Sequence, residues 1–261
     1  MTDIADIRRF WNEQAEAHGQ DPQATTPDRW VREVEIASLS EQLAQLPAGA
    51  TVLDIGCGNG YSVIRLAEQH PDVSFVGGDY APAMIEQARR SLNDHPQLEG
   101  RVSFHEMDVL ALPLDRVFDV VITDRCLINL PSFEDQRRAI ARIARVVRPG
   151  GRYLAVENFH GGQDGLNRQR EQLGLPPIAI RWHNCFLDER AFADACSEFF
   201  DVAPAAPITS TYYLITRCVY SKLCQMAGAE PGYDDPIYEV AAQLPPLGDF
   251  GPVKLVAMVR R

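Results

Sequence analysis

Three features are missing from this sequence, and each absence excludes a class of protein. No stretch is long and apolar enough to span a bilayer, and residues 1–6 lack the basic start and apolar run of a signal peptide. Positive charge is scarce, because 25 Lys and Arg residues stand against 36 Asp and Glu residues and leave a net charge of −11. Nucleic acids and anionic membranes require a basic face, so we expect neither as a partner.

Metal-binding and redox motifs are missing as well. The sequence contains six cysteines but no C-x-x-C pair, and several of the cysteines lie in apolar segments. They are Cys57, Cys126, Cys185, Cys196, Cys218 and Cys224. Reduced thiols in a cytoplasmic protein without a metal site are the simplest interpretation.

The most informative segment that is present is a glycine-rich turn at residues 52–60, between a predicted strand and a predicted helix. Asp54 precedes Gly56, Gly58 and Gly60, and such a turn lets backbone N–H groups approach a ligand at a helix start. Asp54 would repel a pyrophosphate, whereas a ligand that carries both an ammonium and a carboxylate group would be held at both ends. The dinucleotide fingerprint G-x-G-x-x-G would need its third glycine at Tyr61, so the spacing disfavours a dinucleotide.

Strand and helix patterns alternate along the chain, which indicates parallel strands joined by crossover helices. The spacing predicts strands at 51–55, 73–77, 102–106, 118–123, 152–157 and 253–259, and helices at 4–17, 28–46, 61–69, 82–92, 133–147 and 188–199. After Glu157 the alternation loosens: we expect a loop at 161–177, mixed strand and helix at 207–226 and an irregular insertion at 228–252. The predicted fold is a doubly wound α/β domain with a mostly parallel, seven-stranded, Rossmann-like sheet. A single domain would cover residues 1–261, with N-terminal helices at 1–48, a core at 49–160 and a C-terminal region at 161–261.

The segment at 52–60 closely resembles motif I of the class I S-adenosylmethionine (SAM)-dependent methyltransferases, and the chain as a whole resembles those that act on small molecules. In that family the loop holds the methionine part of SAM. The resemblance therefore implies a cofactor role for Asp54, Gly56, Cys57, Gly58 and Asn59. It also implies that the core binds SAM, that the N-terminal helices form a lid, and that the C-terminal region faces the methyl acceptor.

Two further segments are similar to the family's next motifs. Asp79 ends the second predicted strand, where an acid can accept hydrogen bonds from both ribose hydroxyls; a helix N-cap or a solvated acid is the alternative. By the resemblance, Tyr80 and Met84 flank the ribose and adenine, although Met84 fits a core position nearly as well. By the same resemblance, Asp108 would accept a hydrogen bond from the adenine amino group, and the backbone N–H of Val109 would donate to a ring nitrogen. The alternative for Asp108 is a turn residue.

Residues 120–130 resemble the family's fourth motif, and here an absence is informative. Enzymes of this family that methylate DNA bases or protein amides carry an acid or Asn followed by Pro-Pro-aromatic at this point, whereas this chain has Thr123-Asp124-Arg125-Cys126. Together with the acidic composition, this argues against methylation of a nitrogen atom on a macromolecule. Asp124 is either a cap or a site acid, Arg125 would contribute backbone contacts to the cofactor, and Cys126 is interpreted as a packing residue.

The acceptor side has two candidate walls. His183 would take a proton from a hydroxyl, Arg181 would hold a carboxylate, and Asn184 would bind the acceptor beside them. Tyr212, Tyr213 and Arg217 form the second candidate wall. For each of these residues a structural role is the alternative.

A lid from the N-terminal helices would use Trp11, with His18 and Trp30 near it, and we assign Trp11 to the cofactor side. Helix packing is the alternative for both tryptophans.

We therefore expect O-methylation of a small acid or a hydroxylated metabolite, with SAM as the cofactor and S-adenosylhomocysteine (SAH) as its product. No covalent nucleophile is required. A carboxylate acceptor would depend mainly on Arg181, and a hydroxyl acceptor mainly on His183. N- or C-methylation of a small molecule, a dinucleotide-dependent oxidoreductase and a noncatalytic SAM-binding module are the alternatives, and the protein would be a monomer or a homodimer.

Overall fold

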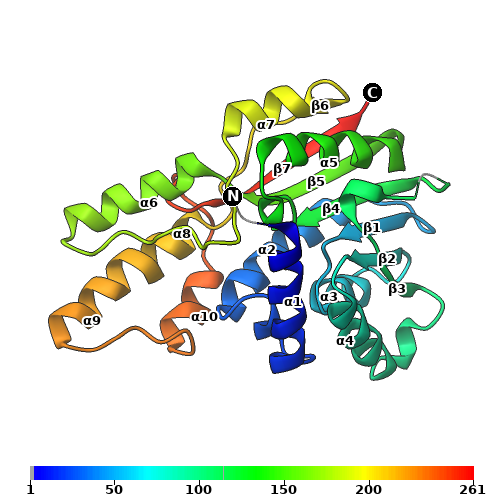
Figure 1. The fold of residues 1–261 in the computed structure, drawn as a ribbon. Helices are drawn as coiled ribbons and strands as arrows, with labels where there is room; N and C mark the ends of the chain where they lie inside the picture. Colours follow the sequence, from blue (N-terminus) through cyan, green and yellow to red (C-terminus); the bar gives the residue numbers. More distant parts are fainter. Residues whose placement is uncertain (1–2, 114) are drawn as a thin grey trace.

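The computed structural model describes residues 3–113 and 115–261, and its centre is a twisted seven-stranded sheet (Figure 1). The strands are β1 Thr51–Ile55, β2 Ser74–Asp79, β3 Val102–Glu106, β4 Phe118–Asp124, β5 Val147–Asn158, β6 Phe200–Val202 and β7 Val253–Arg260. Their order is β3-β2-β1-β4-β5-β7-β6, and β7 alone among them runs antiparallel to its neighbours. The predicted doubly wound, mostly parallel sheet is confirmed.

Helices cover both faces of this sheet. The α-helices are α1 Ile4–His18, α2 Arg29–Leu43, α3 Tyr61–Gln69, α4 Pro82–Asn93, α5 Phe133–Val146, α6 His160–Gln172, α7 Glu189–Cys196, α8 Ser210–Tyr213, α9 Ser221–Ala227 and α10 Pro236–Ala242. A π-helix, η5 Leu214–Tyr220, joins α8 to α9, and short 3-10 turns lie at η1 Pro22–Ala24, η2 Pro96–Leu98, η3 Val109–Ala111 and η4 Leu127–Asn129. None of the helices in the described part of the chain combines the length and the apolar character that crossing a bilayer requires.

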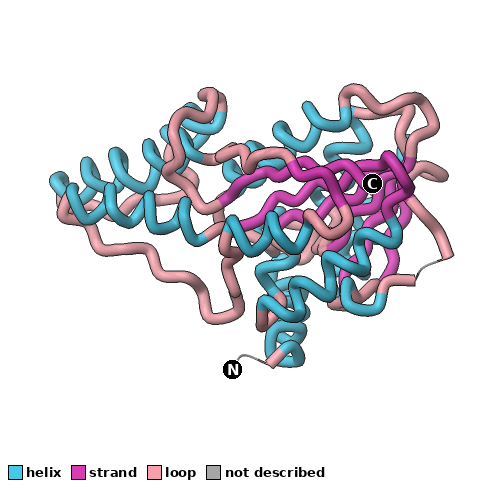
Figure 2. Tube along the Cα trace, turned by 90° about the horizontal axis from the view of Figure 1, so that it is seen from above, coloured by secondary structure: helices cyan, strands magenta, loops and turns pink. Residues whose placement is uncertain are grey.

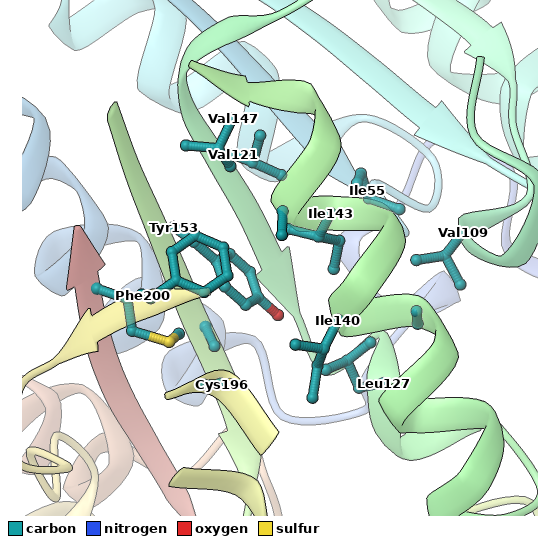
Figure 3. Close-up of a cluster of buried hydrophobic side chains, with 14 of the residues drawn as sticks. Ile55, Val109, Val121, Leu127, Ile140, Ile143, Val147, Tyr153, Cys196 and Phe200 are labelled. Carbon is teal, nitrogen blue, oxygen red and sulfur yellow. The ribbon is translucent and has the colours of Figure 1, made fainter. Parts of the chain in front are cut away.

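Alternate residues of the central strands supply two separate cores. Leu53 of β1 and Val121 of β4 pack with Tyr153 of β5 against α5 and α7, as Figure 3 shows for part of this cluster. Val52 and Val120, one residue earlier on the same strands, pack on the other face against α2 and α3. Strands buried on both faces read as continuous apolar runs, which explains why the core strands were recognisable from the sequence.

A lobe of helices extends from one end of the sheet. In Figures 1 and 2, α6, α8 and α9 project beyond the strands, and α10 lies beneath them in Figure 1. The lobe is built from two connections: α6 follows the carboxyl end of β5, while α8, η5, α9 and α10 lie between β6 and β7. We call this set of helices, with the segment at 175–187, the acceptor lobe.

Three predictions for the C-terminal region were wrong. Residues 161–177 are not a loop, because His160–Gln172 forms α6. Its glycines allow close packing: a Cβ on Gly162 would lie 2.0 Å from the carbonyl oxygen of Gly251. Residues 207–226 contain α8, η5 and α9 but no strand among the described residues, and the segment at 228–252, predicted to be irregular, contains α10.

Candidate active site

The main cavity lies at the carboxyl ends of β1, β2, β4 and β5, between the N-terminal helices and the acceptor lobe. Asp54, Asp79, Asp124 and Asn158, the last or near-last residues of these four strands, all line it. The chain leaves β1 toward β2 on one side, while β4 pairs with β1 on the other. Ligands of open α/β sheets bind at such a switch point.

In the glycine loop between β1 and α3, the backbone conformation and the close neighbours leave no room for residues with side chains. Gly56, Gly58 and Gly60 have φ of +80°, +56° and +81°. A Cβ on Gly56 would lie 2.7 Å from the Cβ of Cys126, and a Cβ on Gly58 would lie 2.7 Å from the Cγ2 of Thr25. The loop therefore fits closely between the end of β4 and the segment after η1, and its backbone is open to the cavity at the start of α3.

Two buried carboxylates face this loop. Asp54 is buried and its Oδ1 has no hydrogen-bond partner among the described residues; burial, and then the charge of Asp124, raises its pKa to about 8. Asp79 accepts hydrogen bonds from the backbone N–H groups of Gly58 at 3.0 Å and Ala81 at 2.9 Å, and burial raises its pKa to about 6 despite these bonds. Asp79 thus serves as a turn cap and also faces the cavity. Carboxylates held this way favour a ligand that is cationic or rich in hydrogen-bond donors.

A second, smaller cavity continues from the first. Asp108 and Val109, which were assigned to adenine, line it together with Ile4 of α1. The two cavities share four residues, namely Gly56, Tyr80, Cys126 and Asn129. Asp108 also caps η3 by accepting the N–H of Leu110 at 2.8 Å, so its turn role is real as well.

A buried ion network forms the floor next to Asp54. Arg32 of α2 donates to Asp124 at 2.5 Å, and the Nε of Arg125 lies 3.2 Å from Glu35. Burial raises the pKa of Glu35 to about 7, opposed by the charge of Arg125. Arg125 has a φ of +54°, which residues other than glycine rarely adopt, so its backbone is held in a strained turn at the cavity wall.

The acceptor-side residues at 181–184 all reach or approach the cavity, but in different environments. His183 is buried and stacks on Phe10 of α1, with ring centroids 4.5 Å apart; burial and the charge of Arg181 lower its pKa to about 4. Its Nδ1 has no hydrogen-bond partner among the described residues. Asn184 lines the cavity, whereas Arg181 is exposed at its rim.

The second candidate wall is only partly as predicted. Tyr213 and Arg217 line the cavity, but Tyr212 lies behind it, where its hydroxyl donates to Asp28 at 2.6 Å. Arg217 also pairs with Asp28, and its guanidinium lies 4.8 Å from the ring centroid of Tyr233. Tyr212 is therefore a buried support for Asp28 rather than a cavity residue.

Comparisons with known proteins point in the same direction as this geometry. A family model described as a methyltransferase domain matches residues 52–151. The chain contains a class I SAM-dependent methyltransferase domain.

Among curated relatives, 27-O-demethylrifamycin SV methyltransferase of Amycolatopsis mediterranei is 36% identical over 188 residues, which cover 67% of this chain and 63% of the relative. Demethylmenaquinone methyltransferase of Deinococcus radiodurans is 38% identical over 122 residues, covering 46% of this chain and 47% of the relative. The chain thus spans between about half and two thirds of the length of these curated relatives. Magnesium protoporphyrin IX methyltransferase of Synechocystis PCC 6803, solved with bound SAH, shares the fold at 18% identity and a TM-score of 0.66, over 99% of this chain and 100% of that one.

The N-terminal helix α1 contributes to the cavity wall, but not every expected residue takes part. Trp11 lines the cavity and its Nε1 donates to Asn129 at 3.2 Å. Met84 lines the cavity and is also a fully buried core residue, so both interpretations of it apply. His18 is exposed at the end of α1, and Trp30 packs beside the buried cluster around α10 rather than on the cavity.

Several buried polar residues near the cavity were missed by the sequence reasoning. Arg32 and Glu35 lie on the apolar face of α2, three residues apart and beside Ile36. Two charged residues on the apolar face of a predicted helix could have indicated a buried ion pair. Arg170 is buried in α6 and donates to the carbonyl of Pro176 at 2.8 Å and to the carbonyl of Arg217. It thereby connects α6 to the segment at 175–187 and to η5, and no local sequence pattern predicted that role.

Proposed function

We propose that this chain is an enzyme that transfers a methyl group from SAM to an oxygen atom of a small molecule. The observation that carries the proposal is the pair of buried carboxylates, Asp54 and Asp79, beside a loop whose glycines have no room for a side chain. When bound, SAM supplies a methyl group already activated on a sulfonium, so the protein has to bind, orient and exclude water.

The residues around the loop suit the parts of this cofactor. Asp54 would hold the ammonium group, because its Oδ1 is buried without a partner among the described residues. The N–H groups of Gly56 and Gly58 already donate to Gly78 and Asp79, so the N-terminal end of α3, which has no side-chain cap, would meet the carboxylate. Asp79 would accept hydrogen bonds from the ribose hydroxyls. Cofactor contacts are proposed also for Cys57, Asn59, Tyr80, Met84, Asp108, Val109, Asp124, Arg125 and Trp11, which line the two joined cavities.

On the acceptor side we assign the proton-accepting role to His183. A pKa lowered to about 4 keeps the imidazole neutral near pH 7, so Nδ1 is free to accept a hydrogen bond from an acceptor hydroxyl. Phe10 and Trp11 pack on the ring and hold it in place. Arg181, Asn184, Tyr213 and Arg217 would contact the rest of the acceptor, and Tyr212 would act through Asp28.

Calorimetric titration of SAH, with NAD as a parallel ligand, tests the cofactor assignment. We expect micromolar binding of SAH that Asp79→Ala abolishes and that NAD does not reproduce. The matched control is Asp72→Ala, which removes an exposed carboxylate from the loop that precedes the same strand and leaves the cavity intact. Preference for NAD, or equal loss of SAH binding in both variants, would contradict the proposal.

A further inference from the structure

The cavity separates into two halves that differ in how their charges are balanced. In the cofactor half, Asp54 and Asp79 have no ion-pair partner among the described residues, and both face the glycine loop. A cation or a set of hydroxyl groups would stabilise their ionised forms. The other half, which we call the acceptor half, is lined by the acceptor lobe and by the start of α2.

Buried guanidinium groups reach both halves, but each is already paired. Arg32 is bonded to Asp124, and Arg125 is paired with Glu35 through its Nε at 3.2 Å and its Nη2 at 3.3 Å. Two longer contacts, Arg32 to Glu35 at 3.4 Å and Arg125 to Asp124 at 3.9 Å, complete the network. Neither arginine therefore offers an unbalanced positive charge to an incoming anion.

Arg217 is the guanidinium that belongs to the acceptor half. It pairs with Asp28, which is itself fixed as the N-cap of α2, and its guanidinium lies within 5.4 Å of the ring centroids of Tyr213 and Tyr233. Its Nη1 nevertheless has no hydrogen-bond partner among residues 3–113 and 115–261, although the atom is buried. Arg217 thus keeps one donor without a partner, while Asp28 compensates its positive charge.

The remaining lining of the acceptor half, apart from Arg181, consists of apolar side chains and neutral amides. Ile178, Phe186 and Tyr213 line its walls, while Ile180 and Tyr233 are 36% and 40% exposed at the opening. The amides that line it are Asn158, Gln163 and Asn184. In the described part of the chain, the one cavity-lining arginine without a carboxylate partner is Arg181, and it lies exposed at the rim, where water screens its charge. A carboxylate that entered this half would lose its hydration, would meet no free cation, and would be repelled by Asp28.

We infer that the methyl acceptor is an uncharged molecule whose carbonyl or hydroxyl oxygen accepts a hydrogen bond from Nη1 of Arg217, and that Asp28 is the residue that excludes carboxylic acids. The inference rests on the proposed methyl transfer to a small molecule and selects the hydroxyl acceptor over the carboxylate. His183, neutral and with an unpartnered Nδ1, is the complementary hydrogen-bond acceptor in the same half.

The experiment measures affinities of matched neutral and anionic probes for the SAH-loaded protein by ligand-observed NMR titration. The probes are benzamide and benzoate, salicylamide and salicylate, and cyclohexanecarboxamide and cyclohexanecarboxylate. In the wild type we expect each amide to bind about tenfold more tightly than its acid, a difference of about 1.4 kcal/mol.

The discriminating variant is Asp28→Asn, because asparagine keeps an oxygen for the cap bonds to the N–H groups of Trp30 and Val31 but removes the charge. We expect the preference for amides to fall or reverse in this variant, since Arg217 would then be unpaired. Asp234→Asn, which changes an exposed acid on the same lobe, is the control and should leave the preference unchanged. If Asp28→Asn does not fold, Arg217→Met serves instead, and it should weaken amide binding without improving acid binding.

Tighter binding of the acids by the wild type would overturn the inference, and so would an unchanged preference in Asp28→Asn. Failure of every probe to bind while SAH binds normally would also overturn it, because the acceptor half would then not be a site for small neutral molecules. Failure of SAH itself to bind would instead refute the proposed function, so the two failures are distinguishable.

Discussion

The protonation of Asp54 links the cavity to the stability of the fold. Burial and the neighbouring Asp124 raise the pKa of Asp54 from 3.8 to about 8 in the folded state. The folded protein therefore holds a proton that the unfolded chain releases above about pH 4, so the free energy of unfolding falls as the pH rises between these two values. Asp54→Asn cannot titrate and loses this part of the pH dependence.

The size of the effect follows from the linkage relation. One proton of difference changes the free energy of unfolding by about 1.4 kcal/mol per pH unit, so Asp54 alone accounts for about 2 kcal/mol between about pH 6 and about pH 7.5. For a domain of this length that corresponds to a difference of about 4–8 °C in Tm. Burial also raises the pKa of Glu157 to about 8, so the variant keeps part of the wild-type slope.

The assay is thermal unfolding of the ligand-free protein across this pH range for the wild type, Asp54→Asn and the control Asp72→Asn. We expect Asp54→Asn to match the wild type near pH 6 and to exceed it in Tm at the upper end of the range. Asp72 is exposed, so its variant should follow the wild type throughout. Parallel loss of stability in the wild type and Asp54→Asn would refute the reasoning, because the buried carboxyl would then not be the group that titrates.

Two further predictions concern backbone and core geometry. Gly56→Ala places an alanine at a φ of +80°, which costs about 1–2 kcal/mol, and puts its Cβ 2.7 Å from Cys126. The control Gly49→Ala has a similar φ of +82° but open space around the Cβ. We expect both to lower the free energy of unfolding and only Gly56→Ala to abolish SAH binding in calorimetry; equal binding by the two would contradict the steric argument. Tyr153→Phe removes the buried 2.8 Å hydrogen bond to Thr123, and we expect chemical denaturation to show a loss of about 1–2 kcal/mol, an unchanged value being the result against it.

The cofactor half was largely predictable from the sequence because its residues follow the ends of strands. Asp54 and Asp79 each end or nearly end a buried apolar run, and parallel strands bring such residues to one edge of the sheet. Tyr80, Met84 and Asp108, which also line the two joined cavities, were assigned through the resemblance to the family. What local patterns did not supply was the contact of this edge with α2, which brings Arg32 and Glu35 to Asp124 and Arg125.

The acceptor lobe was harder to predict because its structure depends on distant contacts. The helix α6 contains Gly161, Gly162 and Gly165, which disfavour a helix locally, yet it forms because Leu166 and Arg170 are buried and because the glycines allow close approach to the segment before β7. The π-helix η5 likewise has no signature in the sequence. Its placement of Tyr213 and Arg217 on the same wall depends on partners in α2 and α6.

The way in which the chain enters and leaves the lobe has a consequence for how specificity can be altered. Ala206 pairs with Leu255 beside β7, and the hydroxyl of Thr209 bonds to the carbonyl of Val253 at 3.0 Å, so the segment at 207–252 starts and ends at one point of the sheet edge. A segment whose ends lie close together can be exchanged for a foreign segment without changing the path of the strands that carry the cofactor half. The exchange has two conditions. Asp28 remains at the N-cap of α2, so a transplanted segment must bring its own cation to the position of Arg217 or leave a carboxylate buried alone. It must also cover Trp30 and Val31 of α2, which pack against Tyr212 and Tyr238.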